Sequence, residues 1–182
     1  CYGNSNAFQS AENSIRLIKL SKCGYEVPVV VGANESIDGG FESAPAYIHG
    51  DNGIGNVELP ESDQKVLNES AVDFILRKAE ELDGELEIIT TGRMTNLAMA
   101  VMKDTKLPKK VKRVVTMGGT LYAKGNVNPY AEANIQGDAQ DAGQDAVVLT
   151  EQDEEPAALA ATMAAPRGVA KTEVGYSNEL NL

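Results

Sequence analysis

Residues 86–119 read LEIITTGRMTNLAMAVMKDTKLPKKVKRVVTMGG, and this stretch predicts the fold. Its two apolar runs, Leu86–Thr90 and Val111–Met117, are rich in β-branched residues and have the character of short strands. Between them, Thr95–Met102 has the apolar spacing of a helix. Strands that alternate with helices are typical of βαβ units, whose strands run parallel. The stretch therefore predicts an α/β protein with an open, mostly parallel, Rossmann-like sheet flanked by helices.

The sequence before this stretch continues the alternation. Ala11–Leu20 predicts an amphipathic helix, Val27–Val31 a buried strand, and Val66–Leu82 a second helix. The polar stretch Asn34–Lys65 is longer than an ordinary connection, and such segments in compact domains are usually functional or disordered.

The domain organisation is that of one partial α/β domain, residues 1–150, followed by a segment of uncertain assignment, residues 151–182. Within that segment, Pro156–Ala165 is rich in Ala and predicts a helix. The remaining tail has no clear pattern.

Polar residues follow both predicted strands, where open α/β sheets bind their ligands. Thr91 to Asn96 (TGRMTN) follow the first strand, Met117 to Gly119 (MGG) follow the second, and residues 125–134 (GNVNPYAEAN) continue from there. In an extended segment Glu132 and Asn134 face the same way. A carboxylate accepts from hydroxyls and an amide both donates and accepts, which suits a sugar. Taken alone, the loop could also be an ordinary polar surface loop.

Composition restricts the possible partners. The chain has 182 residues, a net charge of −11 and a pI of about 4.5. Because an acidic surface repels phosphate backbones, a nucleic-acid polymer is not expected as a partner. The basic run Lys109–Arg113 is explained as a solvated connection. Cys1 and Cys23 have no metal-ligand spacing and indicate a reducing compartment. There is no apolar run of membrane-span length and no signal peptide, so a cytoplasmic location without a membrane partner is expected.

With these residues in view, the chain resembles the inosine–uridine-preferring nucleoside hydrolases from Gly3 to about Asp138. The resemblance rests on the order of its motifs: Gly3-Asn4, HGDNGIG at 49–55, TGRMTNLA at 91–98, MGG at 117–119, GN at 125–126 and PYAEANI at 129–135. Arg93 departs from the small residue or proline common in this family's turn, and Ala133 stands where the family often has an aromatic residue.

The resemblance implies the nucleoside hydrolase fold, present here in incomplete form, and hydrolysis of the N-glycosidic bond of ribonucleosides to free base and ribose, a salvage reaction. It further implies a bound calcium ion, a small-molecule nucleoside as substrate, and a dimer or tetramer. By the same likeness, Asn126, Glu132 and Asn134 hold ribose hydroxyls, and the Thr91 backbone carbonyl binds calcium. The resemblance also places three further substrate-binding residues: Asn4 lies near the attacking water, Met117 beside the sugar, and His49 near the base.

The chemistry of bond cleavage agrees with these residue types. Breaking the N-glycosidic bond builds positive charge on the ribose, which a carboxylate and amide oxygens stabilise. A metal ion can lower the pKa of its bound water and orient it. Each motif also has a structural interpretation without a role in binding. His49 could be a structural or solvated loop histidine, and Gly118-Gly119 could be a simple tight turn.

No catalytic residue is expected within the chain itself. The family's calcium ligands and general base come mainly from an N-terminal motif D-x-D-x-x-x-D-D, expected upstream of Cys1, and from an Asp expected beyond Asp138. We therefore expect a calcium-dependent parent enzyme and an inactive 182-residue chain. The alternatives are a catalytically incompetent nucleoside- or sugar-binding protein, or a truncated fragment that does not fold because a sheet edge is exposed.

Overall fold

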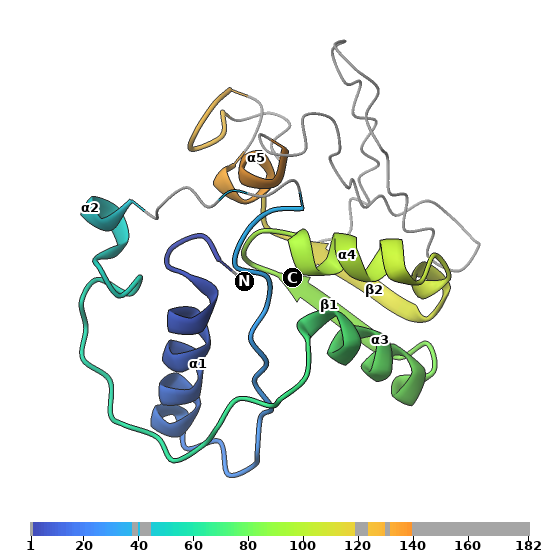
Figure 1. Ribbon diagram of the computed structural model, residues 1–182, viewed down its shortest axis with the longest axis horizontal. Helices are drawn as coiled ribbons and strands as arrows, with labels where there is room; N and C mark the ends of the chain where they lie inside the picture. The colour runs from blue at the N-terminus through green and yellow to red at the C-terminus, as the bar shows by residue number, and fades with distance from the viewer. Residues whose placement is uncertain (1, 38–39, 41–44, 119–123, 130–131, 140–182) are drawn as a thin grey trace, which may run out of the picture.

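The computed structural model describes residues 2–37, 40, 45–118, 124–129 and 132–139. Its elements form two parts that lie side by side (Figure 1). One part contains α1 (Ala7–Ser21), the extended chain that follows it, and α2 (Ala46–His49). The other contains a βαβ unit. A last helix, α5 (Ala133–Ala139), lies beyond the ends of the strands.

The βαβ unit confirms the predicted parallel pairing. Strand β1 (Leu86–Thr90) pairs in parallel with β2 (Val111–Thr116), and Thr90 lies opposite Thr116 at the end of the ladder. The crossover consists of α4 (Thr95–Lys103) and a short 3-10 helix, η1 (Leu107–Lys109). The strands and α4 thus lie within a residue of their predicted bounds, because the apolar pattern and the turns that define them are local.

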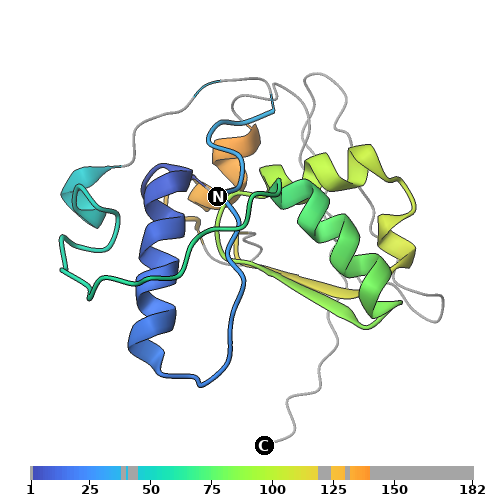
Figure 2. The ribbon, with the colours of Figure 1, turned by 60° about the horizontal axis from the view of Figure 1, so that its bottom comes forward.

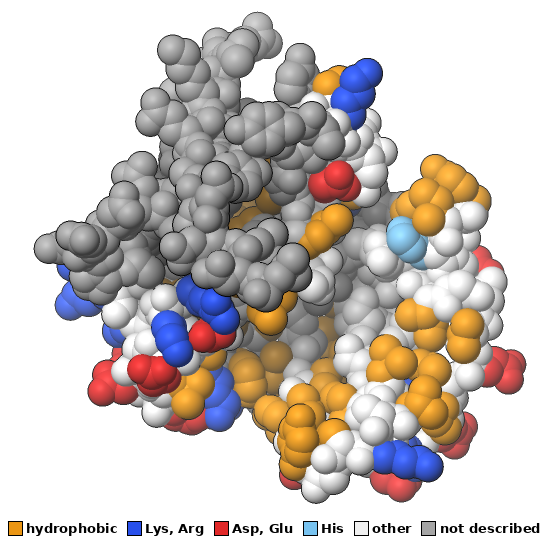
Figure 3. Space-filling model, turned by 180° about the vertical axis from the view of Figure 1, so that it is seen from behind, with side chains coloured by type: hydrophobic (Ala, Val, Ile, Leu, Met, Phe, Trp, Pro, Cys, Tyr) orange, Lys and Arg blue, Asp and Glu red, His pale blue; other side chains and the backbone are white. Residues whose placement is uncertain are grey.

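The hydrophobic core lies between this sheet and its helices. Helices α3 (Ala71–Leu82) and α4 cover the face of the sheet that points toward the viewer in Figure 1. The buried core residues are Ala79, Met94, Leu97, Ala100, Val101, Leu107 and Val111. The opposite face carries Ile89 and Val115, which are 72% and 50% exposed. From behind, hydrophobic side chains are visible at the surface (Figure 3).

Helix α3 begins at Ala71, so the predicted helix from Val66 is wrong at its start. The Ser70 hydroxyl caps the helix by accepting a hydrogen bond from the Asp73 backbone N–H at 3.0 Å. Residues 66–70 are not helical: the Leu67 N–H donates to the Val29 carbonyl at 2.8 Å, and the chain bends at residues 68 and 69.

The predicted strand Val27–Val31 is also wrong within the described residues. This segment runs extended, but its pairing is a single parallel bridge between Val30 and Leu67. A strand needs a partner along its length, which β-branched composition alone cannot supply.

Amide side chains make several of the hydrogen bonds that the first part forms. Asn6 caps α1 by accepting from the Gln9 N–H at 2.8 Å, so the helix begins four residues before the predicted Ala11. The Asn13 amide donates to the Asn52 carbonyl at 2.8 Å, which ties the polar connection to α1. The Ala33 N–H donates to Asn96 Oδ1 of α4 at 2.7 Å and links this part to the βαβ unit.

The predicted helix Pro156–Ala165 and the tail lie outside the described residues. Among the helices that the structure does describe, none combines the length and the apolar character needed to span a bilayer.

Replacing Leu107 by Ala should lower the free energy of unfolding by about 2–5 kcal/mol, because it opens a cavity in the core. Leu107 is fully buried (0% exposed), whereas Met102 on α4 is 56% exposed. Met102→Ala is therefore the matched control and should cost less than about 0.5 kcal/mol. Urea unfolding measures both, and equal losses would contradict the assignment of the core.

Candidate functional site

The two strand ends meet at one edge of the sheet, as their parallel order predicts. The Met117 N–H donates to the Thr90 carbonyl at 2.9 Å and extends the ladder by one step beyond β2. Thr91 and Met117 therefore leave the sheet next to each other. Both side chains are exposed.

Helix α5 lies directly on the chain that leaves β2. The Glu132 N–H donates to the Gly118 carbonyl at 3.1 Å. Gly118 is buried, and a Cβ atom there would lie 2.7 Å from Ile135 Cγ1. A side chain at position 118 would push α5 away, so this glycine permits a close approach in addition to a turn.

Asn134 joins both strand ends. Its Nδ2 lies 3.1 Å from the Thr91 carbonyl, 3.1 Å from the Met117 carbonyl and 3.0 Å from Met117 Sδ. Since these contacts use Nδ2, the atom through which Asn134 can accept from a ligand hydroxyl is Oδ1.

The position of Asn134 corrects one sequence argument. Asn134 lies in the first turn of α5, so Glu132 and Asn134 do not share a face of an extended segment. They meet at the strand ends because the chain turns into a helix there.

Asn126 and Glu132 lie at the start of the same helix. Asn126 Oδ1 accepts from the Ala133 N–H at 2.9 Å and so satisfies one of the donors that a helix start leaves unpaired. Glu132 directly precedes α5 and is half-buried. We call Thr91, Met117, Asn126, Glu132 and Asn134 the strand-end cluster.

The other predicted site residues, Asn4 and His49, lie in the first part. The Asn4 backbone packs against the 50–56 turn, where a Cβ on Gly53 would come within 3.0 Å of the Asn4 carbonyl oxygen. The His49 carbonyl accepts from the Gly55 N–H at 2.6 Å. Figures 1 and 2 both place α2, which carries His49, on the far side of α1 from the sheet. Among the described residues, no hydrogen bond joins either one to the strand-end cluster.

Arg93 is a contact residue that the sequence noted only as a departure from the family pattern. Its Cζ lies 4.5 Å from the centroid of the Tyr2 ring, and its Nη1 donates to the Gly137 carbonyl at 3.2 Å. The sequence separation of these partners explains why no local pattern indicated them.

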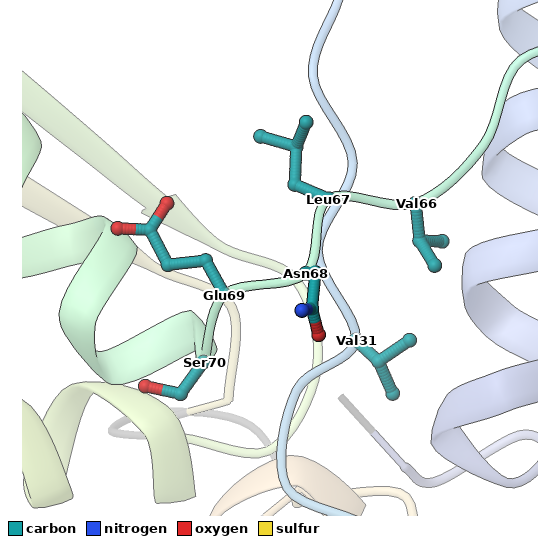
Figure 4. Close-up of a pocket in the computed structure, with 6 residues that line it drawn as sticks. All are labelled: Val31, Val66, Leu67, Asn68, Glu69 and Ser70. Atoms are coloured by element: carbon teal, nitrogen blue, oxygen red, sulfur yellow. The ribbon is translucent and has the colours of Figure 1, made fainter.

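A separate open hollow of about 440 Å³ lies where residues 66–70 pass the extended chain (Figure 4). Its lining residues are Val31, Val66, Leu67, Asn68, Glu69 and Ser70, and no predicted site residue is among them. Glu69 accepts from Arg77 at 3.0 and 2.7 Å, and these bonds hold the pKa of its carboxyl below the usual range. This acid is engaged structurally.

Metal-binding capacity in the described part of the chain is small. No group of three or more His, Cys, Asp or Glu side chains there is arranged to hold a metal ion. The Thr91 carbonyl accepts one hydrogen bond from Asn134 and has a second lone pair, so it fits as one ligand of an oxygen-liking cation.

Comparison with known proteins shows the family to which the chain is similar. Residues 1–172 match the family model described as "Inosine-uridine preferring nucleoside hydrolase", which extends beyond the stretch to Asp138 that the motifs cover. Uridine nucleosidase 1 of Arabidopsis thaliana is 39% identical over 140 residues, which is 76% of this chain and 41% of that protein. The inosine-uridine preferring nucleoside hydrolase of Leishmania major is 37% identical over 111 residues, 60% of this chain and 35% of that protein.

A solved structure is similar at the level of the fold. The purine-preferring ribonucleoside hydrolase from Gardnerella vaginalis has a TM-score of 0.72 and 40% identity, covering 78% of this chain and 46% of that one. The chain spans less than half the length of each of these proteins.

Replacing Asn134 by Leu should loosen α5, because it removes the donor to two strand-end carbonyls. At about 1 kcal/mol for each lost hydrogen bond, the cost should be about 1–2 kcal/mol. Hydrogen exchange of the amides at 133–139 would report it as exchange that is about 5- to 30-fold faster. Asn68→Leu, at an exposed site in the separate hollow, is the control. Unchanged exchange in Asn134→Leu would show that the amide does not hold the helix.

Proposed function

Because the chain belongs to the inosine-uridine preferring nucleoside hydrolase family, we propose that the protein hydrolyses the N-glycosidic bond of ribonucleosides to free base and ribose. The observation that carries this proposal is the contact of the Asn134 amide with both strand ends, through the carbonyls of Thr91 and Met117. That contact brings three separate segments, which carry Thr91, Met117 and Asn134, to one edge of the sheet. The named relatives act on ribonucleosides, so ribose is the part that their substrates share.

The first role of the strand-end cluster is to bind and orient the ribose. The carboxylate of Glu132 and the carbonyl Oδ1 of Asn134 accept hydrogen bonds from ribose hydroxyls. Hydroxyl contacts of this kind supply binding energy away from the bond that breaks. A fixed amide, already held by two backbone carbonyls, loses little side-chain freedom when the ligand arrives.

Its second role is electrostatic. As the bond to the base breaks, positive charge develops on the ribose ring. The Glu132 carboxylate and the Asn134 carbonyl dipole stabilise that charge without moving, which lowers the barrier. In this proposal Met117 provides an apolar contact beside the sugar. We further propose that Asn4 lies near the attacking water and that His49 lies near the base of the nucleoside.

Calcium is part of the proposal as the metal of this site. When bound, such an ion lowers the pKa of a coordinated water and orients it toward the sugar. Thr91 would supply its carbonyl oxygen. Calcium takes about six to eight oxygen ligands, so this carbonyl would supply only a small part of its coordination. A cytoplasmic location and a homodimer or homotetramer belong to the same proposal and rest on no contact described above.

The 182-residue chain by itself should release no ribose from uridine or inosine in the presence of calcium. The reason is the missing group of metal-binding side chains within its described residues. A reducing-sugar assay with overnight incubation measures this. Turnover well above the buffer blank would mean that other residues of the chain supply the calcium ligands, and would contradict this part of the proposal.

In the full-length protein, Glu132→Gln should lower kcat/KM for uridine by about 10- to 100-fold. A hydrogen bond to a charged group contributes roughly 1.5–3 kcal/mol, and the substitution removes the charge while keeping the shape. Glu58→Gln, at an exposed position, is the control. If calorimetry shows ribose or inosine binding without any hydrolysis by the full-length protein, the chain is part of a binding protein instead of an enzyme.

A further inference from the structure

Arg93 is wedged between the N-terminal segment and α5. On one side its guanidinium lies over the Tyr2 ring at 4.5 Å, and the Tyr2 side chain is almost completely buried (1% exposed). On the other side its Nη1 donates to the Gly137 carbonyl at 3.2 Å. A cation stacked on an aromatic ring is attracted to the ring face, so the guanidinium is held from two directions.

Gly137 is the position on α5 that admits this guanidinium. A Cβ atom at residue 137 would lie 2.2 Å from Arg93 Cζ and 2.3 Å from Nε. No side chain can occupy that space while Arg93 keeps its place. Gly137 is itself buried.

The turn that follows β1 contacts α5 at two positions. Thr91 and Arg93 both belong to the turn after β1, and they contact Asn134 and Gly137. Residues three apart lie on one face of a helix, so both contacts fall on the same side of α5. The guanidinium also sits at the C-terminal end of the helix, where a cation is favourable and the last carbonyls lack partners.

We propose that Arg93 is a positioning residue: by stacking on Tyr2 and donating to Gly137, it holds α5 so that the Asn134 amide stays on the strand-end carbonyls. A helix as short as Ala133–Ala139 is not stable on its own, so its contacts decide where it lies. The proposal rests on the proposed function for its effect on catalysis, and on geometry alone for its effect on α5.

The first experiment measures α5 directly in the full-length protein. Arg93→Ala should speed hydrogen exchange of the amides at 133–139 at least about tenfold, while α3 and η1 keep their protection. Arg93→Lys keeps the charge but loses the planar stack, so its effect should be intermediate. Arg113→Ala, which removes an exposed arginine of β2, is the control and should leave α5 unchanged.

A second experiment combines Arg93→Ala with Gly137→Ala, because each substitution should partly compensate for the other. Gly137→Ala should displace the guanidinium and speed exchange about as much as Arg93→Ala does. In the double variant the new methyl group enters the space that Arg93 has left, and Ala favours a helix more than Gly does. The double variant should therefore exchange more slowly than Gly137→Ala alone. Exchange that is faster than in either single variant, as for independent effects, would overturn the proposal. So would normal exchange in Arg93→Ala.

The effect on catalysis is tested through Asn134. Arg93→Ala should raise KM for uridine at least about fivefold in the wild-type background and by less than about twofold when Asn134 is already Ala, because Arg93 acts through that amide. A general structural role would raise KM equally in both backgrounds, and that result overturns the proposal. If Asn134→Ala alone leaves KM and kcat unchanged, the proposed ribose contact is wrong, and the exchange measurements still decide the role of Arg93 in placing α5.

Discussion

The parallel pairing of β1 with β2, which is regular from Glu87 to Thr90 after a register shift at Leu86, is the constraint on which the rest of the structure depends. Because Thr90 lies opposite Thr116, the chain leaves both strands at the same level, and the carbonyls of Thr91 and Met117 become neighbours. Backbone carbonyls at such a place need donors. A single amide, that of Asn134, donates to both, and this one side chain makes the strand ends and α5 a unit. Slippage of the pairing by one residue would separate the two acceptors.

The elements that depend on local sequence pattern could be predicted from the sequence. The strands and α4 were found because their apolar runs are bounded by turns within the same stretch. The starts of α1 and α3 were missed, although Asn6 and Ser70 are residue types that cap helices. A capping argument would have placed both. The run Val27–Val31 could not be decided this way, since its pairing depends on Leu67, far along the chain.

The site was predictable by chemistry more than by geometry. Amides and a carboxylate in residues 125–134 indicated hydroxyl binding, and the parallel order of the strands indicated a common edge. The helix α5 was not expected, because a short segment with Gly137 inside it has little helical tendency without its tertiary contacts. Arg93 was missed for the same reason: its value depends on an aromatic ring and a glycine that lie far from it in sequence. The roles of Asn4 and His49 stay predictions.

Charged side chains border the face of the sheet that lies opposite α3 and α4. Ile89 and Val115 are exposed there, and the strands that carry them are bordered by ion pairs, Arg113 with Glu87 at 2.8 Å and Lys112 with Glu85 at 3.3 Å. Arg113 and Lys112 hold the pKa of Glu87 below its usual range, so the carboxylate stays charged in mild acid. Another molecule that stacks on this face must strip water from these charges, a cost that opposes the gain from contact with the two aliphatic side chains. The charged border thus acts as a gatekeeper against aggregation, and its long-range part fades as added salt shortens the range of each charge.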